Sequence, residues 1–213
     1  MKTDDFISLL ATGVTPVSQA TLARRFCIAL LIGVAGTTVM VASIFGIRPD
    51  LAQVATRPLF WAKVALPLCL MIGSLLVSTR LARPGVAAGK RWVLVGLPVA
   101  AVWVAASYLL TTVPADERLP MILGKTWRGC PFYISMLSVP AFIAVFWALR
   151  GLAPTRLALT GAAGGLLAGS TATLAYCLHC PEMGVAFWGV WYLLGMLVPT
   201  VVGALLGPRL LRW

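Results

Sequence analysis

The sequence predicts an all-α integral membrane protein with six transmembrane helices and both termini in the cytoplasm. Of its 213 residues, 60% are apolar and only 11% are charged, whereas soluble domains carry about a quarter charged residues. The apolar residues fall into six long blocks, and the basic residues gather in alternate loops between them. Composition, block length and charge distribution therefore indicate the same fold class.

Each apolar block is long enough to cross a hydrocarbon core of ~30 Å, which takes ~20 helical residues. The blocks cover residues 26–47, 59–78, 92–113, 131–149, 157–178 and 184–206. Turn-forming segments such as Arg48-Pro49-Asp50 and Arg83-Pro84-Gly85 separate them, and we expect a loop at each.

Alternate loops differ in their basic residues, and this difference predicts the orientation. One set of segments holds eleven: Lys2, Arg24, Arg25, Arg80, Arg83, Lys90, Arg91, Arg150, Arg156, Arg209 and Arg212. The opposite set holds five: Arg48, Arg57, Arg118, Lys125 and Arg128. By the positive-inside rule the richer set is cytoplasmic. We therefore expect a cytoplasmic segment 1–25, a six-helix domain 26–207 and a cytoplasmic tail 208–213.

The net charge of +11 does not indicate nucleic-acid binding in this chain. Its basic residues lie in short loops, where they orient the spans and meet anionic lipid headgroups. We therefore expect membrane lipid as a partner and no nucleic acid.

The predicted spans contain no acidic residue, since all six lie outside them. Proton-coupled carriers and pumps normally use intramembrane carboxylates, so a transporter or metal exporter is disfavoured. Lys63 is the one basic residue within a span, and we expect its long stem to snorkel to the nearby interface.

Three of the five cysteines lie at the predicted outer ends of spans. Cys130 and Cys180 each precede a proline, and Cys177 forms a Cys-x-x-Cys pair with Cys180. A pair of this kind can cycle between dithiol and disulfide, which is permitted outside the cytosol. Cys27 and Cys69 lie within spans and are typical of small apolar packing residues.

His179, the only histidine, lies between Cys177 and Cys180. Thiolate and imidazole ligands suit zinc, copper(I) and similar ions, so Cys130, Cys180 and His179 are candidate ligands of a thiophilic metal that acts as a signal. No obligatory cofactor is expected. The same residues leave a purely structural Cys130–Cys180 disulfide open. A membrane thiol oxidoreductase also stays open as an alternative, although it would usually need a second exposed redox pair.

Gly161, Gly165 and Gly169 follow one another at four-residue spacing in the fifth block. That spacing puts them on one helix face, where a neighbouring backbone can approach closely. We expect a tight helix–helix seam that could transmit a small rotation.

The N-terminal segment predicts a short helix that binds a partner. Thr3 is a candidate N-cap, and Asp4 and Asp5 in the first turn complement the helix dipole. An apolar stripe follows, which has no core of its own to cover it, so the helix either lies on the membrane surface or docks in a partner's groove. The acidic start and the few basic residues along the helix favour the partner. The candidate contacts are Asp4, Asp5, Phe6, Ile7 and Leu10.

Several short motifs follow one another along the chain. They are the N-terminal Met1-Lys2-Thr3-Asp4-Asp5 with its short apolar helix, Arg48-Pro49-Asp50-Leu51, Arg83-Pro84-Gly85, Cys130, Cys180 and the tail Gly207-Pro208-Arg209-Leu210-Leu211-Arg212-Trp213. Together they resemble the NrsF-like family of six-span anti-sigma factors of the bacterial inner membrane. The resemblance covers essentially the whole chain, and the order of the motifs carries it more than any one of them.

The resemblance implies a non-enzymatic regulator that holds an extracytoplasmic-function sigma factor at the membrane. It would release the sigma factor when the periplasmic Cys130 and Cys180 respond to metal or oxidative stress. Cys177 is not part of the pair that the family implies, so its part in sensing rests on the residues alone.

Overall fold

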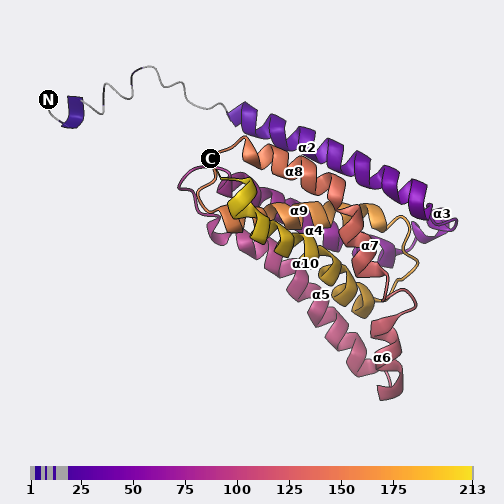
Figure 1. Ribbon diagram of the computed structural model, residues 1–213. Coiled ribbons are helices and arrows are strands. Elements are labelled where there is room, and N and C mark those ends of the chain that lie inside the picture. The colour runs from indigo at the N-terminus through magenta and orange to yellow at the C-terminus, as the bar shows by residue number, and fades with distance from the viewer. Residues whose placement is uncertain (1–2, 6–7, 9–11, 13–18, 213) are drawn as a thin grey trace.

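The computed structural model describes residues 3–5, 8, 12 and 19–212, and the regular structure of these residues is helical throughout. The elements in chain order are α2 (Gln19–Met40), the π-helical η1 (Val41–Phe45), α3 (Leu51–Val54), α4 (Pro58–Leu81), the 3₁₀-helical η2 (Gly89–Trp92), α5 (Val93–Thr112), α6 (Ala115–Leu123), α7 (Cys130–Leu137), α8 (Val139–Arg150), α9 (Leu157–Tyr176) and α10 (Val185–Leu210) (Figure 1).

Five helical stretches are each long and apolar enough to cross a membrane: Ala20–Phe45, Pro58–Leu81, Gly89–Thr112, Leu157–Tyr176 and Val185–Leu210. Helices α7 and α8 pass the same test as a pair, bent by 43° at their junction. The six apolar blocks of the sequence therefore correspond to five continuous helices and one broken pair, and the all-α prediction is confirmed.

Pro140 explains the break in the fourth block, which the sequence predicted as one helix over 131–149. It is the second residue of α8, and a proline there lacks the N–H that a continuous helix would use and crowds the preceding turn. At the C-terminal end of α7 the Ser138 amide donates to the Ile134 carbonyl oxygen at 3.0 Å. The two short helices therefore meet at an angle.

Several helices extend beyond their predicted limits, and α3 and α6 lie where the sequence predicted loops. Helix α2 begins at Gln19, inside the predicted segment 1–25, and α10 continues to Leu210, past the predicted end at residue 206. Helix α6 forms in the loop between the third and fourth blocks, with Asp116 and Glu117 in its first turn, where acidic side chains are favourable.

Helix α9 is the centre of the bundle and packs against α10, α4, α8, α2 and α7. In its apolar segment 67% of the residues are buried, whereas only 6% are buried in the apolar segment that contains α5. Figure 1 shows α5 diverging from the other helices toward α6. The buried core therefore lies around α9, and α5 presents most of its surface outward.

The glycine stripe of α9 lies against the backbone of α10. A Cβ on Gly161 or Gly165 would collide with the carbonyl groups of Gly203 or Pro199, and a Cβ on Gly169 would lie 2.9 Å from Pro199 Cγ. The predicted tight seam is confirmed, and its partner is α10.

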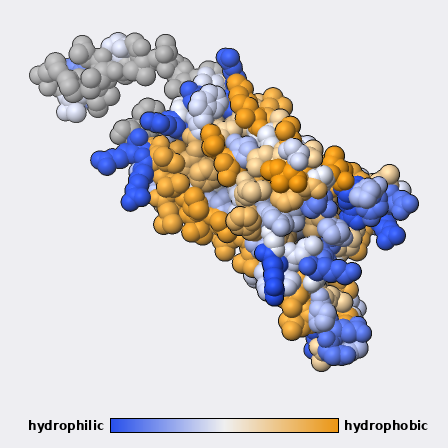
Figure 2. Space-filling model, turned by 45° about the vertical axis from the view of Figure 1, so that its right-hand side comes forward, coloured by the Kyte–Doolittle hydropathy of each residue, from blue (hydrophilic) through white to orange (hydrophobic). Residues whose placement is uncertain are grey.

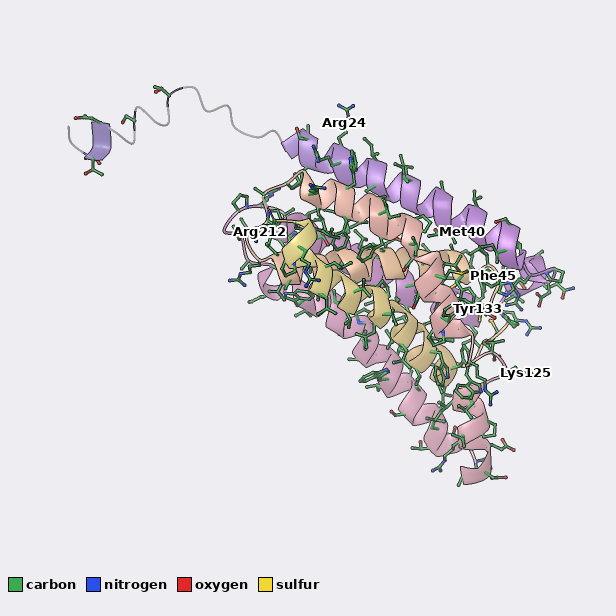
Figure 3. The ribbon with its side chains drawn as sticks, viewed as in Figure 1. Arg24, Met40, Phe45, Lys125, Tyr133 and Arg212 are labelled. Atoms are coloured by element: carbon green, nitrogen blue, oxygen red, sulfur yellow. The ribbon has the colours of Figure 1, made fainter. Side chains whose placement is uncertain are left out.

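The two ends of the bundle differ in what they carry. Arg24 and Arg212 lie at one end, whereas Phe45, Tyr133 and Lys125 lie toward the other, with α3 and α6 (Figures 1 and 3). Figure 2 shows broad apolar surface on the helices, with hydrophilic patches mostly toward the ends. We call the end with α3, α6 and the α9–α10 loop the cysteine end.

The described part of the N-terminal segment is helical at residues 3–5 and 8. The Ser8 hydroxyl donates to the Asp4 carbonyl oxygen at 2.8 Å, one helical turn back, and Asp4 and Asp5 are exposed. The predicted contacts Phe6, Ile7 and Leu10 lie outside the described residues.

Candidate functional site: a buried cysteine cluster

Three cysteines from two parts of the chain converge at the cysteine end of the bundle. Cys130 is the first residue of α7, Cys177 directly follows α9, and Cys180 lies in the α9–α10 loop. All three are free thiols packed in one hydrophobic cluster, and their exposed fractions are 0%, 1% and 0%. The structure thus brings Cys130 close to Cys180 and adds Cys177 to the same cluster.

Two tyrosines that the sequence analysis did not single out complete the cluster. The Tyr176 hydroxyl is within hydrogen-bonding reach of the Cys130 thiol. The Tyr192 hydroxyl is buried beside the thiols of Cys177 and Cys180 without a hydrogen bond of good geometry. The position of Tyr176 directly before the Cys-x-x-Cys pair was the one available signal, and nothing in the sequence marked Tyr192.

Lys63 does not snorkel to the membrane interface, which corrects the expectation from the sequence. Its side chain is completely buried, and its ammonium donates to the carbonyl oxygens of Cys180 at 2.7 Å and Glu182 at 2.8 Å. It also lies 5.6 Å from the centre of the Tyr192 ring. The two backbone carbonyls of the α9–α10 loop accept the hydrogen bonds that water at the interface would otherwise accept. The sequence of the span alone does not show that this loop folds against Lys63.

Arg48 ties the same loop to the segment after α2. Its backbone amide donates to the Leu178 carbonyl oxygen at 3.1 Å, and its guanidinium donates to the Cys180 carbonyl oxygen at 3.2 Å. Two further guanidinium nitrogens bind the Asp50 carboxylate at 2.7 and 2.8 Å. This bidentate hydrogen bonding raises the pKa of Arg48 and lowers that of Asp50.

Glu182 ties the loop to a third segment, which precedes α7. Its carboxylate accepts a hydrogen bond from the Lys125 backbone amide at 2.7 Å and a longer one from the Thr126 hydroxyl at 3.4 Å. The α9–α10 loop is therefore attached to the segment after α2, to α4 and to the segment before α7.

His179 is held away from a role as a metal ligand in this arrangement. Its Nδ1 lies 3.0 Å from the Gly46 carbonyl oxygen, and its ring packs between those of Phe45 and Tyr176. Within the described part of the chain, no three His, Cys, Asp or Glu side chains are placed to hold one metal ion. Binding by Cys130, Cys180 and His179 would require the loop to rearrange, and it stays a prediction.

Cys27 and Cys69 lie on the surface of the bundle, whereas the sequence was interpreted as placing them in helix packing. An apolar side chain in a membrane span can face either lipid or protein, which hydropathy does not distinguish. Neither residue belongs to the cysteine cluster.

Disulfide formation and soft-metal binding stay predictions for this cluster, in which Cys177 and Cys180 at the end of α9 meet Cys130 at the start of α7. Thiol reactivity requires the thiolate and access by the reagent. Because all three thiols are buried, a reagent from water reaches them only when the structure around the cluster opens.

Comparison with known proteins agrees with the sequence resemblance. The NrsF family model, described as a negative regulator of sigma F, matches residues 10–213. A probable anti-sigma-F factor NrsF of Azospira oryzae is 46% identical over 215 residues, and the anti-sigma-F factor NrsF of Caulobacter vibrioides is 35% identical over 214 residues. Both alignments cover the whole of both chains. No solved structure matches the chain.

Proposed function

Because this chain belongs to the NrsF family of negative regulators of sigma F, we propose that it is a membrane-bound anti-sigma factor. It sequesters an extracytoplasmic-function sigma factor at the bacterial inner membrane and releases it under metal or oxidative stress. The family is one of regulators and not of enzymes. Two relatives that align along their full length and are named as anti-sigma-F factors carry this proposal.

The proposed orientation places the cysteine end in the periplasm and the termini in the cytoplasm. The eleven-to-five distribution of basic residues supports it, because positively charged loops stay on the cytoplasmic side. The sigma factor is then bound from the cytoplasm, where residues 1–25 include the proposed contacts Asp4, Asp5, Phe6, Ile7 and Leu10.

The proposed signal is a change in the state of Cys130, Cys180 and Cys177, either by disulfide formation or by binding a thiophilic metal ion. The convergence of the three thiols in one buried cluster supports this proposal. A tenfold loss of sigma affinity needs only ~1.4 kcal/mol of coupling. One covalent or metal link between α7 and the α9–α10 loop is sufficient for a change of that size.

The test replaces Cys130 and Cys180 together with serine and measures a sigma-dependent reporter with and without oxidant or metal. We expect the double variant to keep the reporter silent in both conditions, because it binds the sigma factor but no longer senses stress. A double variant that still releases the sigma factor normally would refute thiol sensing.

A second variant tests the proposed sigma contact. Combined F6A, I7A and L10A substitutions remove the apolar stripe, and we expect the reporter to be active without stress while the protein stays in the membrane fraction. Retained co-purification with the sigma factor would exclude this stripe as the contact.

A further inference from the structure

Lys63 is an unusual residue because its charge is buried without an acidic partner. Its side chain has no exposed surface, and among the described residues the one ion pair is that of Arg48 and Asp50. The nearest candidate, Glu182, directs its carboxylate toward Lys125 and Thr126. An ionisable residue inside a membrane span is costly, so its surroundings indicate what it is for.

Those surroundings are the α9–α10 loop, residues 177–184, which we call the cysteine loop because it contains Cys177 and Cys180. The Lys63 ammonium reaches the carbonyl oxygens of Cys180 and Glu182 at 2.7 and 2.8 Å, and these are charge-assisted hydrogen bonds of short length. Its charge also faces the thiols of Cys130 and Cys177. Lys63 thus binds the loop on both sides of Pro181, and its charge acts on the thiol cluster.

Apart from Lys63, Cys180 itself is held by one hydrogen bond from its amide and one to its carbonyl oxygen. The Cys180 amide donates to the carbonyl oxygen of Tyr176, the last residue of α9, at 3.0 Å. Residues 181–184 have no regular structure. Without Lys63 the Glu182 carbonyl would lose the one hydrogen bond that the structure gives it, and the Cys180 carbonyl would keep only that from Arg48 at 3.2 Å. Buried carbonyls without partners are unfavourable, so the closed loop depends on this ammonium.

We propose that Lys63 is the positioning residue of the cysteine loop, holding Cys180 buried beside Cys130 and Cys177 and so setting how readily reagents reach the thiols. This inference rests on the proposed thiol-sensing function and adds the residue that sets its threshold. Since Lys63 belongs to α4, which packs along α9, opening the loop also frees a contact between the loop and this helix.

The experiment uses the full-length protein in lipid nanodiscs and an anionic maleimide, and follows each cysteine by peptide mass spectrometry. We expect K63M to raise the labelling rate of Cys180 about tenfold, equivalent to ~1.4 kcal/mol, because methionine keeps the length of the side chain and loses all three donors. K63R keeps the charge and several donors, and we expect it to restore most of the protection.

Two controls separate positioning from general loosening and from surface charge. Leu66 lies one turn further along α4 in the buried cluster that contains the three thiols, so L66A removes packing there and leaves the hydrogen bonds from Lys63 to the loop in place. Arg57 is exposed, so R57Q removes a nearby charge that could attract the anionic probe. We expect Cys180 to be labelled much faster in K63M than in either control.

The inference is overturned if Cys180 is labelled at the wild-type rate in folded K63M, or if L66A exposes it equally. That failure is distinct from failure of the proposed function. Labelling does not involve the sigma factor, whereas thiol sensing is judged by the stress response of the C130S/C180S variant.

Discussion

Arg48 donates a hydrogen bond through its guanidinium to the carbonyl oxygen of Cys180 at 3.2 Å, across 132 positions of sequence. The same guanidinium is fixed by the Asp50 carboxylate through hydrogen bonds of 2.7 and 2.8 Å. The arginine side chain is 8% exposed and the aspartate side chain 47% exposed. An exposed acid therefore orients a mostly buried cation that reaches the cysteine loop, and acidification should weaken this arrangement.

The first prediction concerns that pH dependence. The hydrogen bond from Arg48 lowers the pKa of Asp50 below its ordinary value of 3.8. A carboxyl with a lowered folded pKa contributes stability that is present above its unfolded pKa and is lost as the pH falls through the folded pKa. D50N resembles the protonated side chain, so the difference in Tm between wild type and D50N should be constant near neutral pH. It should shrink below pH 3.8. A difference that stays the same at acidic pH would contradict the role given to this carboxylate.

The second prediction concerns the α9–α10 seam. A Cβ on Gly161 would collide with the Gly203 carbonyl, and overpacking of this kind costs about 1–3 kcal/mol. We expect G161A to lower the free energy of unfolding in detergent by at least that amount. The matched control is G96A in α5, where a Cβ meets nothing within 4 Å.

In the control, replacing a helical glycine with alanine should stabilise the helix by about 0.5–1 kcal/mol. The two substitutions are chemically identical, so opposite signs would isolate the effect of the seam. Equal effects on unfolding would show that α9 and α10 do not need this close approach.

The third prediction concerns which thiols can join. Cys180 is an electrostatic neighbour of both Cys130 and Cys177, and it acts on Cys130 more strongly than Cys177 does. We expect oxidation of C177S to give a Cys130–Cys180 disulfide and oxidation of C130S to give a Cys177–Cys180 disulfide. C180S should be the most damaging single substitution, because it removes the thiol that both pairs share.

Peptide mass spectrometry after mild oxidation in non-reducing conditions checks this prediction. A Cys130–Cys177 disulfide that forms in C180S as fast as disulfides form in the wild type would contradict a central role for Cys180.

The sequence predicted the all-helical fold and the tight glycine face of α9, because hydropathy and four-residue spacing are local properties. It also singled out Cys130, Cys177 and Cys180 through their positions at the ends of apolar blocks. It did not predict Lys63 and Tyr192 at the site, since both lie within spans and contact the α9–α10 loop only through folding. The break at Pro140 was visible as a residue, but its effect depends on neighbouring helices that accept a bend.

The prediction that Lys63 snorkels to the membrane interface was wrong for a reason that lies outside its own span. For an isolated helix, a lysine near the interface has the lowest free energy when its side chain extends to place the ammonium in water. In the folded protein the α9–α10 loop brings two backbone carbonyls to Lys63, and a buried ammonium is acceptable where such partners replace water. The decisive contacts are 117 and 119 positions away in sequence, beyond any pattern in the span itself.

The fourth prediction concerns orientation, on which the proposed sensing mechanism depends. Asp116 in α6 and Arg212 after α10 are both exposed and belong to opposite ends of the bundle under the charge distribution. In a background in which the five native cysteines are replaced by serine, we expect D116C to react in intact cells with a maleimide that does not cross the inner membrane. R212C should react only after the membrane is made permeable, because the eleven basic residues on that side predict a cytoplasmic location. The reverse pattern would place the cysteine cluster in the cytoplasm, where disulfides are normally kept reduced, and would remove the basis for periplasmic sensing.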